Sequence, residues 1–243
     1  MIEQLQNFLT SQDERELSAV PVPVLVALVL GIALQLAWHS VQDKPVARAS
    51  DLSPPPALSL LEVASLGDQV ALSRLLMLRL QAFDNQPGIS VPFKELDYAV
   101  LTEWLEAISL LDRQSQYPFL SAARVYAKVL DDEKKRQMLD FVHRGFLENP
   151  NRRWPAMAHA VFIAKHRLKD LDLALELARD LRIHASGPGV PPLVRQMELF
   201  VLEDIGDIES AKILLGSFLE SGVIRDQREL DFLKQRLGVQ QQD

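Results

Sequence analysis

The chain has 243 residues, of which 48% are apolar and 24% charged, an ordinary mixture for a globular protein of one or two domains. Its formal net charge of −7 argues against a general nucleic-acid-binding protein, because such proteins neutralise phosphates with a basic surface. Because cysteine is absent, the sequence excludes a disulfide framework, a thiolate nucleophile and a Cys-ligated zinc site.

The most apolar stretch of the chain lies near its N-terminus. Residues 20–38 contain no charged side chain, and a helix of that length covers roughly 28 Å, close to the thickness of the hydrocarbon core of a bilayer. We therefore predict a single transmembrane helix over residues 20–39, which contacts the lipid bilayer through residues 20–38 and places Trp38 at the membrane interface. The preceding tail, residues 1–19, is either frayed or an interfacial helix that lies on the lipid.

A cleaved signal peptide is the alternative interpretation of this stretch. The segment before it is acidic, the apolar run is too long, and the small-residue site Ala47-Arg48-Ala49 lies too far downstream, so these features favour an anchor. The positive charges on the two flanks are nearly balanced and do not fix the orientation. The common topology of anchors with short N-terminal tails favours a body on the extracytoplasmic side. We predict a single-pass protein of a bacterial inner membrane with its body in the periplasm.

The remainder of the chain is predicted to be helical. Residues 40–57 contain Pro45 and three consecutive prolines, which is typical of a semi-stiff spacer. From residue 58 to residue 238, apolar residues recur at helical spacing without the alternation of strands, so we expect an all-α domain with no strand, followed by a short tail at 239–243. Helices are expected to begin at Leu58, after the N-cap Asp68, near Lys94, at Tyr117, after the acids at 131–133, near Trp154, after the turn at Lys169-Asp170, at Pro192, at Ile208 and at Gln227.

Three phrases in this domain resemble the tetratricopeptide repeat family. They are GFLENP at 145–150, W-x-x-M-A at 154–158 with Ala174 downstream, and GDIESAKILL at 206–215. In that family, small residues lie where paired helices touch, a large aromatic residue opens the first helix and proline ends the second. The resemblance covers roughly residues 115–222, and it implies a right-handed α-solenoid of helical hairpins.

The resemblance also assigns roles to single residues. It implies that Gly145, Ala174 and Ala211 are small residues at helix contacts and that Pro150 ends a helix. The repeats lack a uniform period, and the first helix of the pair that Trp154 opens is about one turn longer than the family's.

The repeat pattern places Arg152, His159 and Phe162 on a concave face, and His166 follows one turn later. A guanidinium, an imidazole and an aromatic ring suit an acidic or carboxylate-bearing peptide, so these four residues are the candidate partner-binding residues. The alternative is that they only solvate an exposed helix face.

The sequence contains no recognisable catalytic motif. It contains no nucleophile elbow, phosphate-binding glycine loop or dinucleotide fingerprint, so we predict that the protein is not an enzyme and has no cofactor. His159 and His166 share a helix face, but no HExxH motif or nearby carboxylate completes a ligand set, and we predict no metal site. A metal-dependent enzyme that uses these two histidines is the alternative.

A block of positive charge lies in the middle of the chain. Residues 134–169 contain nine Lys or Arg and two acidic residues, a local charge of +7. Its first members, Lys134-Lys135-Arg136, follow three acids and are explained by helix initiation; contact with lipid phosphates is the alternative.

These features together favour a membrane-anchored scaffold of helical pairs that binds a protein partner at the membrane, as an accessory or assembly subunit of a larger complex. A structural spacer is a further alternative. Such a protein would assemble through its transmembrane helix, with Gly31 and Gln35 toward a neighbouring helix.

Overall fold

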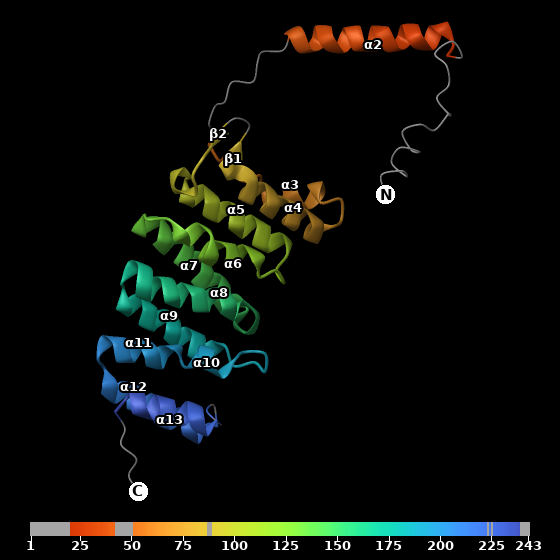
Figure 1. The fold of residues 1–243 in the computed structure, drawn as a ribbon. Coiled ribbons are helices and arrows are strands. Elements are labelled where there is room, and N and C mark those ends of the chain that lie inside the picture. Colours follow the sequence, from red (N-terminus) through yellow and green to blue (C-terminus); the bar gives the residue numbers. More distant parts are fainter. Residues whose placement is uncertain (1–19, 42–50, 87–88, 223, 225, 239–243) are drawn as a thin grey trace, which may run out of the picture. The chain divides into compact units, whose positions relative to one another are not determined.

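A computed structural model describes residues 20–41, 51–86, 89–222, 224 and 226–238 (Figure 1). The chain divides into two compact units, residues 1–47 and 48–243. The predicted N-terminal tail, residues 42–50 of the predicted spacer and the predicted C-terminal tail lie outside the described residues.

The first unit contains helix α2, Val22–Val41. Its stretch Val22–Ser40 has a mean hydropathy of 2.0 and is long and apolar enough to cross a membrane, a test that a signal sequence near the N-terminus also meets. Large apolar side chains such as Leu34 and Trp38 are about 70% exposed within the unit. Apolar surface of this kind is unfavourable in water, as expected for a membrane span or a signal sequence.

The second unit is helical, as the periodicity predicts. Its α-helices are α3 (Leu58–Ala64), α4 (Gln69–Gln81), α5 (Tyr98–Leu111), α6 (Tyr117–Arg124), α7 (Asp132–Glu148), α8 (Pro150–Ile163), α9 (Leu171–His184), α10 (Pro192–Arg195), α11 (Met197–Ile205), α12 (Ile208–Glu220) and α13 (Gln227–Arg236). Short 3-10 turns lie at η2 (Ala82–Asp84), η3 (Phe93–Glu95) and η4 (Tyr126–Lys128), and a π-helical turn at η5 (Ala164–Leu168).

The expectation of a domain with no strand was wrong at one place. Strand β1, Asn85–Gln86, pairs with β2, Ile89–Ser90, in antiparallel register. Two residues join the strands, which is the commonest hairpin connection. Strands of two residues are too short to produce a detectable alternation of apolar and polar side chains, so the sequence pattern did not reveal them.

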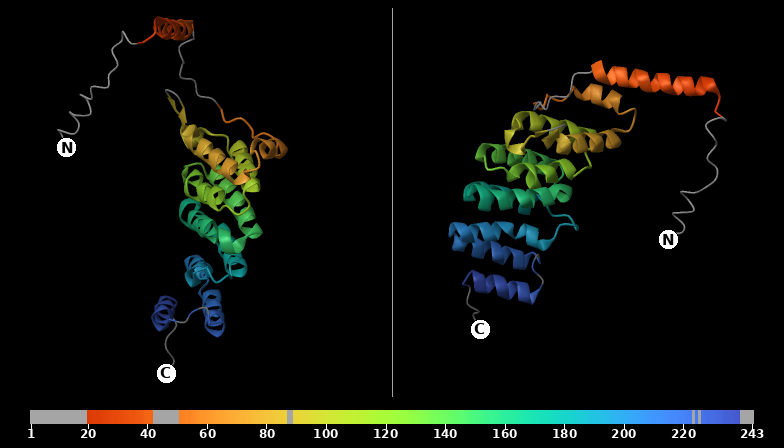
Figure 2. Two further views of the ribbon diagram at one scale, coloured as in Figure 1. Left: turned by 90° about the vertical axis from the view of Figure 1, so that its right-hand side faces the viewer. Right: turned by 45° about the horizontal axis from the view of Figure 1, so that its top comes forward.

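Neighbouring helices along the chain supply most of the packing in this unit. α4 packs on α5, α6 lies against α7 and α8, α8 against α9, α9 against α11, and α11 against α12. Two further views show the same succession of helices (Figure 2). Each helix therefore buries its apolar face mainly on elements close to it in sequence.

The apolar interior forms two clusters. The larger one extends from Leu52 to Val201, and the smaller one joins α11, α12 and α13 around Leu199, Phe218 and Leu233. Leu52 lies in the predicted spacer, yet it is buried, and the carbonyl of the next residue, Ser53, accepts a hydrogen bond of 2.8 Å from the Trp104 indole. The end of the proline-containing stretch thus belongs to the helical unit.

Aspartates begin many of the helices. The predicted N-cap Asp68 is confirmed, because its carboxylate accepts a hydrogen bond of 2.9 Å from the Ala71 amide. The same arrangement recurs at Asp97, Asp131, Asp170, Asp207 and Asp226. A short acceptor at this position satisfies an amide that the helix leaves unpaired. At α5 the cap lies at residue 97, so the helix starts later than the predicted Lys94.

The predicted boundary between α7 and α8 needs correction. Pro150 does not end α7; it is the first residue of α8, so this helix begins four residues before Trp154. Proline is favoured in the first turn because its missing amide hydrogen has no partner there. A single residue, Asn149, joins the two helices. At the other end, the turn at Lys169 is confirmed by its left-handed φ of 54°, and the π-helical turn η5 precedes it.

Candidate partner-binding site

A cavity of about 440 Å³ opens beside α6, η4, the first turn of α7, and the segment from α8 to η5. Its lining has an apolar part and a basic part. The apolar residues are Ala123, Ala127, Val129, Leu130, Phe162 and Ile163; the basic residues and histidines are Arg124, Lys128, Lys135, His159, His166 and Arg167. The volume lies within the range of ligand-binding cavities.

Buried contacts fix the η4 side of the cavity. The Tyr98 hydroxyl of α5 donates a hydrogen bond of 2.8 Å to the backbone carbonyl of Tyr126, which is fully buried. The ring of Phe93 meets the Tyr126 ring edge-on at 5.3 Å. These contacts tie η4, which includes Lys128, to α5 and η3.

His159 lies on α8 and is bonded to α6. The Arg124 Nε donates a hydrogen bond of 2.7 Å to the His159 Nε2, so this nitrogen is an acceptor and the ring is neutral. Partial burial lowers the pKa of His159 below its usual value of 6.5, and the positive charges of Arg124 and Lys128 lower it further. The cavity therefore presents a neutral imidazole beside a guanidinium.

Phe162 and His166 form a ridge one turn further along the chain. Their ring centroids are 4.7 Å apart, and Phe162 is 50% exposed. Of the four predicted partner-binding residues, the structure brings His159, Phe162 and His166 together at one cavity.

Arg152 lies apart from these three residues. It is in the first turn of α8, where its Nε donates a hydrogen bond of 2.6 Å to the backbone carbonyl of Gln114, and it is not among the residues that line the cavity. The repeat pattern grouped it with His159 because the two share a helix face, but the Arg152 side chain contacts the segment between α5 and α6.

Sequence reasoning missed the cations on the facing elements. Arg124 and Lys128 lie outside the basic block at 134–169 and about 35 residues from His159, so no local pattern connects them. Lys135 lies in the first turn of α7, after the capping acid Asp131, as helix initiation predicts. Its side chain is also buried, and its Nζ donates to the carbonyl of Leu130 at 3.2 Å and to Asp132 at 2.6 Å.

Three cations at this cavity have no carboxylate partner within the described part of the chain. Arg124, Lys128 and Arg167 form no ion pair there, whereas Lys135 of the same cavity pairs with Asp132. The residues with such ion pairs include Arg144, Arg179, Arg182 and Arg236. The cavity therefore combines an exposed apolar surface with positive charge that the protein itself does not neutralise.

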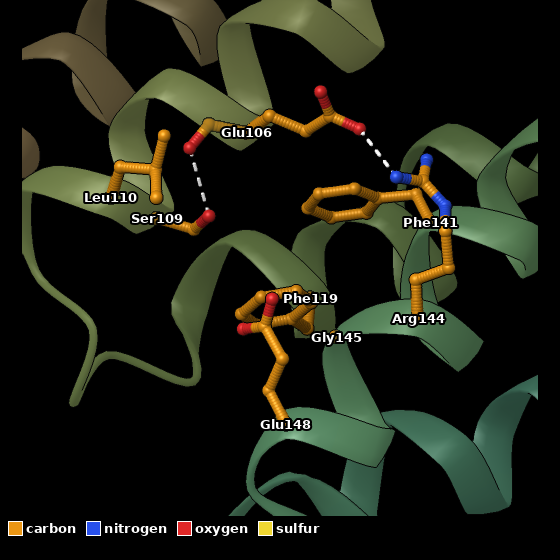
Figure 3. Close-up of a pocket in the computed structure, with 8 residues that line it drawn as sticks. All are labelled: Glu106, Ser109, Leu110, Phe119, Phe141, Arg144, Gly145 and Glu148. Atoms are coloured by element: carbon orange, nitrogen blue, oxygen red, sulfur yellow. Dashed lines mark hydrogen bonds and ion pairs between the residues drawn. The ribbon is translucent and has the colours of Figure 1, made fainter. Parts of the chain in front are cut away.

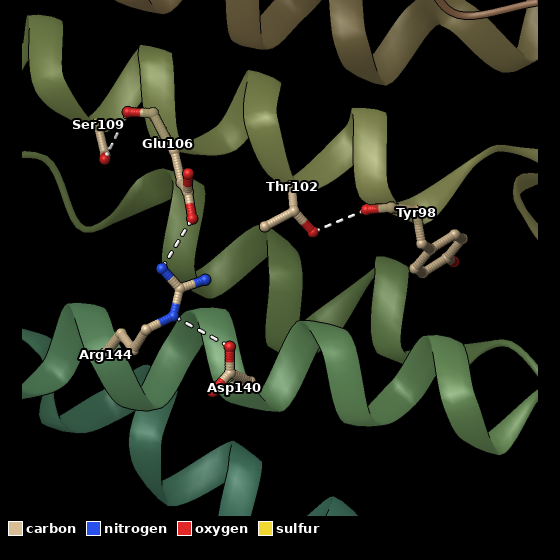
Figure 4. Close-up of polar contacts among 6 residues, drawn as sticks. All are labelled: Tyr98, Thr102, Glu106, Ser109, Asp140 and Arg144. Atoms are coloured by element: carbon tan, nitrogen blue, oxygen red, sulfur yellow. Dashed lines mark hydrogen bonds and ion pairs between the residues drawn. The ribbon is translucent and has the colours of Figure 1, made fainter.

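Two smaller cavities of about 200 Å³ are also present. One lies where α5, α6 and α7 meet, around Phe119 and Phe141 (Figure 3). There, Arg144 bonds Glu106 at 2.9 Å and Asp140 at 3.0 Å, so its charge is compensated (Figure 4). The other is lined by residues of α8, η5, α11 and α13, including Phe162 and His166, which it shares with the large cavity.

A search of the described residues finds no group of three or more His, Cys, Asp or Glu side chains placed to hold a metal ion. The Nε2 of His159 accepts a hydrogen bond from Arg124. Comparison of the chain with protein-family models, with curated proteins and with solved structures gives no match.

Proposed function

We propose that this chain is a membrane-anchored scaffold that binds a protein partner, as an accessory or assembly subunit of a membrane complex. The observation that carries the proposal is the cavity beside α6 and α8. Two apolar residues of its lining are exposed, Leu130 to 93% and Phe162 to 50%. They lie next to cations that have no carboxylate partner in the described chain. Exposed apolar side chains with polar surroundings are typical of protein–protein contact sites.

The body of the scaffold is a right-handed, tetratricopeptide-like solenoid in this proposal. Support comes from the helix contacts between close neighbours in sequence and from the small residues at those contacts. Ala174 and Ala211 are fully buried, and a Cβ added to Gly145 would lie 1.9 Å from the Phe119 ring. Stacked helical pairs present an extended surface that is ordered before the partner arrives.

The anchor is α2, which crosses a bacterial inner membrane in this proposal and leaves the body in the periplasm. Its length and hydropathy support a membrane span, and its exposed apolar side chains need lipid or another helix around them. Tethering raises the local concentration of the scaffold beside membrane partners without a new contact.

Site-specific photo-crosslinking tests the function in native membranes. A photoreactive amino acid replaces Phe162 in the full-length chain, and the matched control carries it at Ile213 of α12, which is 69% exposed. We expect one discrete crosslinked protein from position 162 and none from position 213. Identical crosslink patterns from the two positions would contradict the proposal.

Replacing the anchor separates the scaffold from a spacer that assembles through the membrane. In this variant, an unrelated apolar helix of equal length replaces residues 22–40. A scaffold keeps the crosslink from position 162, because only the tether is needed. Loss of the crosslink with normal membrane insertion would instead support assembly through α2, where nothing lies within 4 Å of a Cβ placed on Gly31.

A further inference from the structure

The large cavity and one of the smaller cavities meet at a common ridge. Both are lined by Phe162 and His166, whose rings are in contact. A ligand that crosses this ridge therefore touches the η4 side of the large cavity and the α11 side of the small one. This arrangement suits a chain-like ligand, because a compact molecule would occupy only one of the two cavities.

The two cavities differ in charge. In the large cavity, Arg124, Lys128 and Arg167 form no ion pair with a carboxylate of the described chain. In the small cavity, Lys165 is paired with Asp204 and Arg236 with Glu203. Among the described residues, Lys135 is the one ion-paired cation of the large cavity, with Asp132, whereas both cations of the small cavity are paired.

The small cavity contains no unpaired Lys or Arg among the described residues, and the rest of its lining is mainly apolar. Apart from its two paired cations and His166, it is lined by Val161, Phe162, Met197, Phe200 and Val201. The Arg236 guanidinium lies over the Phe200 ring, 5.1 Å from its centroid, so its charge is also held against an aromatic face. This side of the ridge favours large apolar side chains.

We propose that the site binds a bipartite segment of a partner protein, with a cluster of acidic residues on the α6 side of the Phe162–His166 ridge and a cluster of large apolar residues on the α11 side. The inference rests on the proposed function, since it names the segment that a scaffold of this kind would hold. Carboxylates of the segment pair with Arg124 and Lys128. Its apolar side chains cover Phe162 and reach Phe200.

The proposal requires that the acidic residues and the apolar residues of the ligand form two separate blocks. Fluorescence anisotropy measures binding of a labelled peptide, four glutamates followed by leucine, alanine, leucine and phenylalanine, to the full-length chain in detergent. The matched peptide has the same composition with glutamates and apolar residues alternating. We expect the block peptide to bind about tenfold or more tightly than the alternating one, a difference of about 1.4 kcal/mol. Equal affinities would overturn the bipartite site.

Variants of the protein locate each half. Arg124→Glu with Lys128→Glu should weaken the block peptide about tenfold or more, while Arg74→Glu, the same reversal on exposed α4, should leave it within about twofold. Thermal unfolding of each variant confirms that it is folded.

Modified peptides test the apolar half without altering the protein. In one peptide, serine replaces each leucine of the apolar block. In another, a benzophenone in the apolar block should crosslink to α11. Crosslinking only to α6 or η4 would contradict the assignment.

An anionic lipid is the competing ligand. If dihexanoyl phosphatidylglycerol binds with higher affinity than the block peptide and displaces it completely, the site is a lipid site and the proposal is wrong. The test also separates the scaffold proposal from the bipartite ligand. If a protein is crosslinked at position 162 in membranes but the block peptide shows no preference, the scaffold proposal is retained and only the bipartite ligand is contradicted.

Discussion

Gly145 lies where α7 crosses α6, and its missing side chain makes that contact possible. The facing Phe119 ring is buried, stacks on Phe141 at 4.9 Å and has the Arg153 guanidinium 4.1 Å from its centroid on another side. Arg153 is itself held by the carbonyls of Gly145 and Arg113, at 2.6 and 3.0 Å. The ring therefore has little room to move away from an added methyl group.

We predict that Gly145→Ala lowers the free energy of unfolding by about 1–3 kcal/mol, the usual cost of overpacking a core. The control is Gly216→Ala in α12, where an added Cβ meets nothing within 4 Å. Removing glycine from a helix interior should raise stability there by about 0.5–1 kcal/mol. Urea unfolding followed by circular dichroism measures both changes. A stabilising effect at position 145 would show that α6 and α7 do not meet closely.

His159 gives a prediction about pH. Its folded-state pKa is lowered, chiefly by burial, so below about pH 6.5 the unfolded chain takes up a proton that the folded chain resists. The free energy of unfolding should therefore fall as pH falls from about 7.5 to 5.5. His159→Gln should flatten this decline, whereas His184→Gln, which alters an exposed histidine, should preserve it. Unfolding curves at several pH values test the difference; equal slopes in all three proteins would contradict it.

At the scale of elements, capping and turn chemistry explain where the helices begin. Asp170 follows the left-handed Lys169 and accepts a hydrogen bond of 2.9 Å from the Leu173 amide, while its second oxygen pairs with Arg136 at 2.8 Å. The pKa of Asp170 is lowered mainly by the Leu173 hydrogen bond, and also by Arg136. One side chain thus starts α9 and joins it to α7.

We expect Asp170→Ala to cost about 1–2 kcal/mol of unfolding free energy, because the cap and the ion pair are both removed. Asp170→Asn keeps the cap and should cost about half as much or less. The part of the stability that depends on the lowered pKa is present at neutral pH and is lost as pH falls through the folded-state pKa. Thermal unfolding at pH 7 ranks the variants; an Asn variant as unstable as Ala would show that the ion pair, and not the cap, dominates.

At the scale of the whole molecule, packing between sequence neighbours predicts uneven stability within the helical unit. The cluster around α12 and α13 contains far fewer buried residues than the main core, and α12 makes its main described contact with α11 alone. Elements with few buried contacts open more easily than those in a large core.

Hydrogen exchange of the full-length chain tests this unevenness. Amides of α12 and α13 should exchange at least about tenfold faster than those of α7, α8 and α9, because a partial opening releases only the smaller cluster. The central helices provide the internal control in the same sample. Exchange at one common rate across all these helices would mean that the unit unfolds as a single cooperative body.

The sequence by itself determined the features that depend on local spacing. Apolar residues at helical intervals predicted the helical class, the uncharged run predicted α2, and a short acidic side chain before an apolar run predicted the cap at Asp68. The boundary at Pro150 was predicted wrongly, because proline both follows helices and begins them. No feature of the sequence predicted the π-helical turn η5.

Only the tertiary structure decided which side chains meet. The bond between Arg124 and His159 joins residues 35 positions apart, and that between Arg153 and the Arg113 carbonyl joins residues 40 apart. The structure also set Arg152 apart from the cavity that its helix neighbours line. Spacing along a helix fixes the face on which a residue lies, but the packing of the next helix fixes what that face contacts, and this packing depends on the shapes of many buried side chains at once.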